Sequence, residues 1–267
     1  MARSSHAKVE PVPPRSPKDT YITVYGRKPV LEALRDPALT VDKVITADNA
    51  RGDTLTAILR AARERGVPVL TASPHRVKVL AGNGHHDQGV LADVLAPRMR
   101  PVHDYLEELA EWPGDTPCAL LVLDAVTNPA NVGMVLRTAT AAGLDGVLVP
   151  RRGVPAIDPL VIKASAGVAF RAPVLRAATA AEGCAALRTA GITVLGLAGD
   201  GDTSLLGDPL PERIALVLGN ETEGLSEAVR AELDGTVSIP MHGGVESLNV
   251  ASAAAVASYE LLRRRTR

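Results

Sequence analysis

The stretch Ile214–Leu262 decides the fold that this sequence predicts. It reads IALVLGNETEGLSEAV (214–229), TVSIPMHGGVESLNV (236–250) and ASAAAVASYELL (251–262). The apolar runs Ile214–Leu218 and Thr236–Ile239 predict two buried strands, because Gly219-Asn220 and Pro240, which follow them, are poor continuers of a strand. The stretch therefore predicts two strand–loop units followed by a long C-terminal helix.

Polar residues gather where these apolar elements end. Glu221, Ser247 and Asn249 lie beside glycines of the two loops. In open α/β sheets, ligands bind outside the carboxyl ends of the strands, so we expect the functional site here. Ser247 also suits the N-cap of the closing helix, and that structural role is the simpler interpretation for it.

The rest of the chain alternates between strand and helix patterns, which predicts a largely parallel sheet flanked by helices. Residues 1–20 are rich in proline and charge and predict a disordered leader. Residues 21–97 predict a small α/β unit, residues 98–117 a linker, and residues 118–267 the larger domain. Ala119–Leu123 is apolar throughout, as expected for a strand that is buried on both faces of a sheet.

The totals restrict the class of protein. The 267 residues carry a net charge of −1, so any contact with a polyanion must come from local basic spots, such as Arg151-Arg152 and the arginines that close the chain. The two cysteines lack the spacing of metal ligands, and His85-His86-Asp87 brings no further ligand set, so we expect no metal site. We find no signal peptide and no apolar run long enough for a membrane span, which predicts a cytoplasmic protein.

A dinucleotide-binding fold is the ordinary interpretation of such an alternation. Its glycine fingerprint should follow the first strand and open the next helix. That turn reads DAVTNPANVGMVLRTA, with the single glycine Gly133, while the glycines of Gly196–Gly201 have the wrong spacing. Dinucleotide binding is therefore disfavoured. With an aromatic content of 2%, base stacking is also a weak route to RNA, which leaves backbone amides, arginines and shape.

Three stretches together resemble the SpoU/TrmH family of RNA ribose 2′-O-methyltransferases, in the SPOUT superfamily. They read LVLDAVTNPANVGMVLRTATAAGLDGVLV (121–149), LVLGNETEGLSEAV (216–229) and VSIPMHGGVESLNVASAAAVASYE (237–260). The segment VIKASAGVA (161–169) resembles one that these enzymes carry between the first two motifs, and residues 25–96 resemble the substrate-binding domain of many members. The resemblance implies a C-terminal domain with a deep trefoil knot, preceded by an RNA-binding domain.

The resemblance also implies a cofactor and a set of site residues. S-adenosylmethionine would be held by the knot loops, at Leu218, Gly219, Ile239, Met241 and Leu248. The catalytic set would comprise Asn131, Arg137, Glu221, Ser247 and Asn249. Because a guanidinium is a poor proton acceptor, we expect Arg137 to grip a phosphate and polarise the hydroxyl, with Glu221 holding Arg137 by a charge-assisted pair. Such enzymes are typically homodimers.

The leading hypothesis is S-adenosylmethionine-dependent ribose 2′-O-methylation of large-subunit (23S) ribosomal RNA, since the two-domain layout is that of ribosomal-RNA members. The alternatives are a transfer-RNA 2′-O-methyltransferase, and a non-catalytic RNA-binding or ribosome-assembly factor on the same scaffold. Retention of the full polar set argues against a non-catalytic protein.

Overall fold

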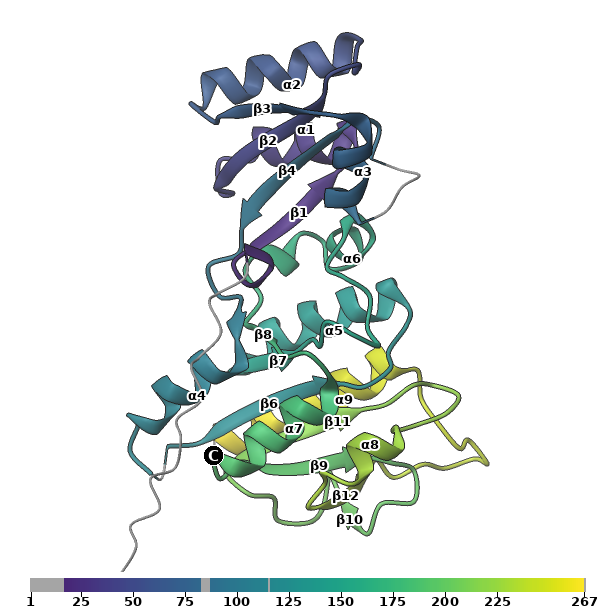
Figure 1. Cartoon of the computed structure of the whole chain (residues 1–267). Helices are drawn as coiled ribbons and strands as arrows, with labels where there is room; N and C mark the ends of the chain where they lie inside the picture. The colour runs from purple at the N-terminus through teal and green to yellow at the C-terminus, as the bar shows by residue number, and fades with distance from the viewer. Residues whose placement is uncertain (1–16, 83–86, 115, 267) are drawn as a thin grey trace, which may run out of the picture.

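The computed structural model describes residues 17–82, 87–114 and 116–266, which form two α/β units stacked one above the other (Figure 1). The smaller unit consists, in chain order, of β1 (Tyr21–Tyr25), α1 (Arg27–Arg35), β2 (Val41–Ala47), α2 (Asp53–Glu64), β3 (Val69–Ala72), α3 (Pro74–Ala81) and β4 (Val90–Leu95). Its sheet has the order β1-β4-β2-β3, in which β4 runs antiparallel to both neighbours and β2 pairs parallel with β3. Strand β1, whose YITVY sequence alternates apolar and polar positions, adds an edge strand that the sequence analysis did not separate.

The larger unit is built on one eight-stranded sheet. Its elements are β5 (Arg100–Pro101), α4 (Val102–Ala110), β6 (Cys118–Leu123), α5 (Pro129–Ala141), β7 (Gly146–Leu148), α6 (Pro159–Ala164), β8 (Val174–Arg176), α7 (Ala180–Thr189), β9 (Thr193–Leu197), β10 (Thr203–Ser204), β11 (Arg213–Leu218), α8 (Glu227–Arg230), β12 (Gly235–Ser238) and α9 (Val250–Arg265). The strand order is β10-β12-β9-β11-β6-β7-β8-β5, and every pair is parallel. The predicted parallel α/β architecture is confirmed.

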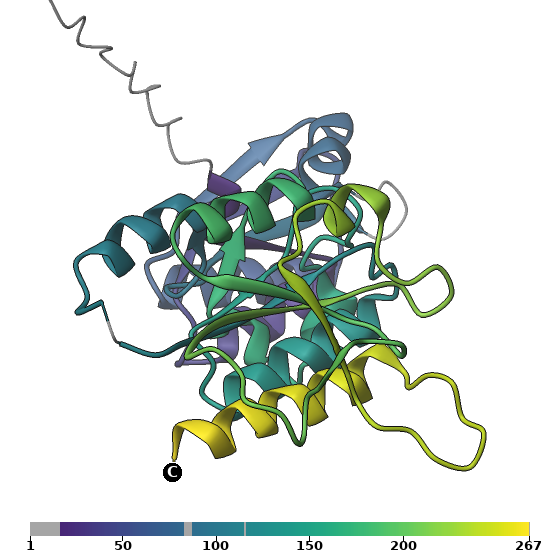
Figure 2. The ribbon, with the colours of Figure 1, turned by 90° about the horizontal axis from the view of Figure 1, so that it is seen from below.

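Helices cover both faces of this sheet, which explains its continuous apolar strands. All six residues of β6 are buried. Leu120 and Val122 pack with side chains from α4, α7 and α8, whereas Leu121 and Leu123 belong to the cluster formed with α5 and α9. Figure 2 shows the sheet between α7 (green) and α9 (yellow), which lie on its opposite sides. The side chains that alternate along β6 therefore fill two separate cores.

The segment 98–117, expected to be a linker, contributes to the larger unit. Strand β5 pairs with β8 at the edge of the sheet, and α4 buries Val102, Tyr105 and Leu109. The amphipathic pattern of α4 carries enough apolar surface to dock the segment against α7. These residues therefore form part of the fold of the larger unit.

The last residues of the predicted leader, 17–20, belong to the folded structure. Residues 1–16 lie outside the described part of the chain, but Pro17–Asp19 form a 3-10 turn. Asp19 is buried, and Arg151 donates a hydrogen bond to its carboxylate. The end of the predicted leader is thus joined to the larger unit.

Two features dock the helices and the units closely. A Cβ atom at Gly133 of α5 would lie 2.5 Å from the carbonyl oxygen of Val161, so only glycine lets α5 and α6 approach this closely. Between the units, the hydroxyl of Tyr25 donates a hydrogen bond of 3.2 Å to Asp158, the N-cap of α6.

Among the residues described, no helix has the length and hydropathy needed to cross a membrane.

Candidate active site

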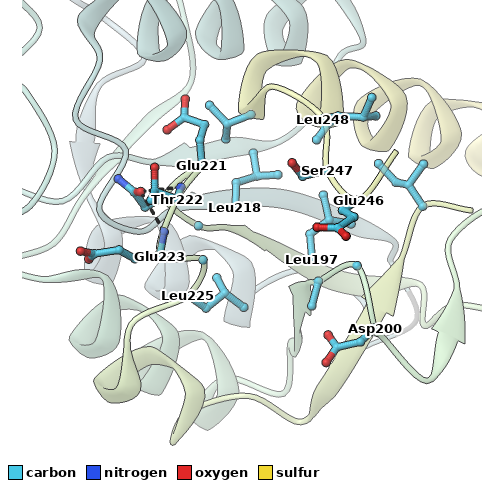
Figure 3. Close-up of a pocket in the computed structure, with 18 of the residues that line it drawn as sticks. Leu197, Asp200, Leu218, Glu221, Thr222, Glu223, Leu225, Glu246, Ser247 and Leu248 are labelled. Atoms are coloured by element: carbon cyan, nitrogen blue, oxygen red, sulfur yellow. Dashed lines mark hydrogen bonds between the residues drawn. The ribbon is translucent and has the colours of Figure 1, made fainter. Parts of the chain in front are cut away.

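A pocket of about 360 Å³ lies at the carboxyl ends of β9, β11 and β12 (Figure 3). Parallel strands bring the loops that follow them to the same edge of a sheet, which is where ligands bind in open α/β folds. Its lining comes from the loops after these three strands and from the start of α9. The loops after the two strands singled out in the sequence, β11 and β12, thus share one pocket.

The loop after β11 forms a fixed wall of this pocket. The backbones of Asn220 and Gly224 exchange two hydrogen bonds of 2.9 Å, and the Asn220 side-chain oxygen accepts from the amides of Thr222 and Glu223. A Cβ atom at Gly219 would lie 2.5 Å from the carbonyl carbon of Gly224. Glycine is therefore required at position 219 for the loop to fold back this tightly.

A buried carboxylate fastens the far end of the same loop. Asp124, at the end of β6, accepts hydrogen bonds from the backbone amide of Ser226 at 2.7 Å and from its hydroxyl at 3.1 Å. The Asn220 side chain donates to the carbonyl of Ala125, next to Asp124. Three hydrogen bonds thus hold the loop after β11 against the turn after β6, and the role of Asp124 in two of them was not identified from the sequence.

All five residues expected to contact the cofactor line this pocket, namely Leu218, Gly219, Ile239, Met241 and Leu248. Leu218 and Ile239 are buried, whereas Leu248 is 36% exposed at the mouth. The pocket thus offers apolar side chains next to the backbone of the loop after β11. This combination suits a planar, partly polar ligand such as a nucleoside.

Three of the expected catalytic residues meet beside the pocket. The Asn131 side-chain amide donates to Glu221, and the Asn249 amide donates to the Asn131 side-chain oxygen at 3.2 Å. They come from α5, from the loop after β11 and from the residue before α9, respectively. Asn131 is buried and forms the centre of the network.

Arg137 stands apart from this network. It lies on the exposed side of α5, six residues beyond Asn131, which is about 9 Å along the helix axis. The expected charge-assisted pair with Glu221 is absent from the described residues, where Glu221 accepts from Asn131 instead. Arg137 is therefore accessible to a partner from outside the chain.

The N-cap of the closing helix corrects a second expectation. The side-chain oxygen of Asn249 accepts from the amides of Ala251 at 2.9 Å and Ser252 at 3.4 Å, so Asn249 and not Ser247 caps α9. Ser247 is exposed and lines the pocket. Helix α8 begins at Glu227 with Ser226 as its cap, so Glu221 belongs to the loop before that helix.

Several lining residues were missed. Gly199 and Asp200 follow β9, Glu246 belongs to the loop before α9, and Arg230 closes α8. Gly199 and Asp200 could have been found from their place at the carboxyl end of β9. They were missed because the glycines of that loop were compared only with the dinucleotide-binding fingerprint. Among the described residues, no group of histidine, cysteine and acidic side chains is arranged to hold a metal ion, and His85-His86 fall outside the described residues.

Comparisons with known proteins agree with this geometry. Residues 119–259 match the SpoU rRNA methylase family, and residues 23–100 match the RNA 2′-O ribose methyltransferase substrate-binding domain. The chain is 38% identical over 253 residues to an uncharacterized tRNA/rRNA methyltransferase of Mycolicibacterium vanbaalenii, an alignment that covers 92% of this chain and 77% of the relative. It is 35% identical over 243 residues to the 23S rRNA (guanosine-2′-O-)-methyltransferase RlmB of Xylella fastidiosa, covering 91% of this chain and 96% of that protein.

A solved structure shows the same likeness. The SpoU methyltransferase AviRb from Streptomyces viridochromogenes, determined in complex with AdoMet, superposes with a TM-score of 0.59 at 26% identity, over 92% of this chain and 91% of that one. The likeness thus extends over both units.

Proposed function

Because this chain belongs to the SpoU rRNA methylase family and is therefore an S-adenosylmethionine-dependent RNA methyltransferase, we propose that it methylates a ribose 2′-hydroxyl of large-subunit ribosomal RNA. The relative from Xylella fastidiosa carries that activity in its name and is covered almost completely by the alignment. The observation that carries the proposal is the joining of Asn131, Glu221 and Asn249 at the rim of the pocket.

The pocket fits S-adenosylmethionine. Adenine needs an apolar slot and backbone groups that pair with its edge, and Leu218, Ile239 and Leu248 provide the slot beside the loop after β11. The Gly219 backbone can approach a ligand closely because it carries no side chain. When bound, the cofactor supplies the methyl group.

The chain's own residues position the ribose that receives the methyl group. Asn131 and Asn249 present amide groups that can orient a ribose or the methionine end of the cofactor, and Glu221 fixes the Asn131 amide in place. Arg137 carries a planar fork of donors that matches a phosphate, so it can hold the backbone of the RNA next to the target hydroxyl. Holding the reactants in line is a major part of the work in such a transfer.

Further parts of the proposal concern the chain path, the assembly and the location. The two loops around the pocket and the packing of α9 on α5 and β11 support the trefoil knot that the family resemblance implies. Met134 on α5 is 39% exposed and Tyr259 on α9 is 52% exposed, and these apolar surfaces on neighbouring helices support a homodimer. A protein that modifies ribosomal RNA works in the cytoplasm.

The test is a map of ribose methylation. Full-length protein, S-adenosylmethionine and unmodified 23S rRNA should give one newly methylated ribose. The Gly219→Ala variant should give none, because the added Cβ collides with the Gly224 backbone and distorts the loop after β11. Gly207→Ala is the matched control, since its nearest neighbour would be the Ser204 side chain at 3.6 Å. Methylation of transfer RNA in place of 23S rRNA would refute the substrate assignment.

A further inference from the structure

A second pocket, of about 300 Å³, lies between the two units of the chain. Its walls come from β1 and α3 of the smaller unit, and from the loop before α6 and the end of β8 of the larger unit. Both Asp158 and Arg176 line it, and they follow β7 and end β8 at the carboxyl edge of the large sheet. The pocket therefore shares its sheet edge with the cofactor pocket but opens beside the substrate-binding domain.

The guanidinium of Arg176 brings unused hydrogen-bond donors to this pocket. Its Nη1 atom donates to the carbonyl of Val149 at 2.7 Å. Its Nε atom is buried and has no hydrogen-bond partner among the residues that the structure describes. Burial, followed by the nearby charge of Arg151, lowers the pKa of Arg176 to about 10, which leaves the group charged at neutral pH. A guanidinium carries its donors in a planar fork, and only one hydrogen bond from this fork is formed within the described residues, so Arg176 suits a ligand with two neighbouring acceptors.

A carboxylate and two aromatic rings complete the lining. One oxygen of Asp158 accepts from the backbone amides of Leu160 and Val161, and the other accepts from the Tyr25 hydroxyl, which leaves that second oxygen able to take one more donor. Tyr21 and Tyr25 both line the pocket, although the whole chain has only four tyrosines. Ile22, Ile157 and Met99 supply apolar walls.

We propose that this pocket between the two units binds an unpaired guanine of the RNA substrate, against Tyr21, with its O6 and N7 facing Arg176 and its amino edge facing Asp158. The inference rests on the proposed function and adds a second point of RNA recognition. Guanine is the base that offers two neighbouring acceptors to an arginine fork, and unstacked RNA bases are commonly held on aromatic side chains.

The bound guanine is a different nucleotide from the one methylated. Strand β8 is separated from β11 by β6 and β7, so the ends of these two strands, one beside each pocket, lie about 14 Å apart along the sheet edge. An RNA strand that runs along this edge passes the start of α5, which follows β6. Reading a second base would let the enzyme choose its ribose by the surrounding sequence.

The four methionines make the test direct. Met99 lines the pocket between the units, Met241 lines the cofactor pocket, Met134 is exposed on α5, and Met1 lies outside the described residues. In full-length protein labelled with ¹³C at the methionine methyl groups, guanosine monophosphate should shift the Met99 signal and leave Met241 in place. Adenosine, cytidine and uridine monophosphates should bind at least about fivefold more weakly, the lower end of what one bidentate base contact discriminates.

Two variants separate recognition from folding. Arg176→Lys keeps the charge but removes the fork, so it should abolish the preference for guanosine monophosphate, whereas the exposed Arg171→Lys should not. Tyr21→Leu, a milder change at the pocket wall, should weaken binding of guanosine monophosphate at least about fivefold through lost stacking. A Met241 signal that still responds to S-adenosylmethionine shows that each variant is folded.

The outcomes are distinct. Equal shifts of Met99 with all four nucleotides, or none at tens of millimolar, would overturn the guanine pocket. If guanosine monophosphate moves Met99 but an rRNA fragment with unpaired guanines does not, the pocket serves a free nucleotide and the assignment to RNA is wrong. Failure of 23S rRNA methylation would overturn the proposed function instead, because the nucleotide titration contains no methylation step.

Discussion

Arg137 is the exposed cation nearest to the network of Asn131, Glu221 and Asn249 along α5, and its environment suggests a role in binding RNA. It lies on an exposed helix face, and a guanidinium offers donors but no acceptor for a proton. If it acts as a planar fork on phosphate and hydroxyl, lysine cannot replace it. Both Arg137→Ala and Arg137→Lys should slow methylation by about 100-fold or more, the scale of losing a positioned catalytic group.

The measurement is single-turnover methylation of 23S rRNA beside calorimetric titration of S-adenosylmethionine. The affinity for the cofactor should stay within about twofold of wild type, because Arg137 does not line the cofactor pocket. Arg171→Lys is the matched control, as another exposed arginine of the same unit. Near-normal turnover in Arg137→Lys would show that only the positive charge of Arg137 matters. A collapse of cofactor binding would show that Arg137 supports the cofactor and not the RNA.

The position of a single residue is easier to predict where it follows from the end of a strand than where it depends on the path of a loop. The five residues expected to contact the cofactor line one pocket because parallel strands deliver their ends to one edge. Ser247 and Asn249 are both good helix caps, and the choice between them depends on how residues 241–249 turn into α9. The partner of Glu221 depends equally on the fold of its loop, which brings it to Asn131.

At the scale of the element, α9 shows how a basic chain end is absorbed into the fold. Glu260 is buried, and it accepts from Arg263 and Arg264 at 2.6 to 2.7 Å. Arg264 also donates to the carbonyl of Leu205, and Arg265 pairs with Asp145. Arg264 and Arg265 therefore fasten the helix end to residues that flank the sheet, whereas Arg263 pairs within the helix.

This cluster predicts a pH dependence of stability. The hydrogen bond from Arg263 is the largest cause that lowers the pKa of Glu260, followed by that from Arg264, so the carboxylate stabilises the folded state above its unfolded pKa of about 4.3. That stabilisation is lost as the pH falls through the lower pKa of the folded state. Glu260→Gln should reduce the unfolding free energy by about 1 to 3 kcal/mol at pH 7, because it leaves two guanidinium groups without their carboxylate.

Denaturant unfolding at pH 7 and at pH 3 measures the effect. The difference between wild type and Glu260→Gln should shrink at pH 3, where the wild-type carboxylate begins to protonate. Glu107→Gln is a suitable control, since Glu107 is exposed on α4 and forms no salt bridge within the described residues. A difference that is constant over this range would mean that packing, and not charge, accounts for the loss.

Elements with clear patterns were predictable from the sequence, whereas the shortest were not. The strands Cys118–Leu123 and Arg213–Leu218 are apolar runs with breakers beyond them. Strands β5 and β10 have two residues each, too few for any pattern, and they exist because a neighbouring strand offers them a free edge. Helix α5 begins at Pro129, because Asn128 caps it and proline suits the first turn.

At the scale of the whole molecule, we expect the two units to divide the work between binding RNA and performing the transfer. The cofactor pocket and the network of Asn131, Glu221 and Asn249 lie wholly within the larger unit, whereas residues 23–100 match a substrate-binding domain. The division was predictable from the motifs, but its boundary was not. Residues 98–117 carry several prolines, which suggested a linker, yet the apolar face of α4 packs them into the larger unit.

The position of this boundary predicts the behaviour of two fragments. A fragment starting at Arg98 keeps β5 and α4, whereas one starting at Thr116 lacks both and exposes the surface that Val102, Tyr105 and Leu109 cover. Burying side chains of this size contributes roughly 1.5 to 3 kcal/mol each, and 1 kcal/mol shifts the Tm of a fragment of this length by about 2 to 4 °C. The shorter fragment should therefore melt at least about 10 °C below the longer one, as measured by circular dichroism.

The longer fragment also tests the division of work. It should bind S-adenosylmethionine within about threefold of the full chain, because every residue that lines the cofactor pocket is retained. Its methylation of 23S rRNA should fall by about 100-fold or more, since the substrate-binding domain and its contacts with the RNA are gone. The comparison is the full chain assayed at raised salt concentration. It keeps the substrate-binding domain, but the salt weakens its contacts with phosphates, so its methylation activity should also fall. Undiminished methylation by the Arg98 fragment would show that the larger unit recognises the RNA unaided, and equal melting of the two fragments would show that α4 contributes nothing to its stability.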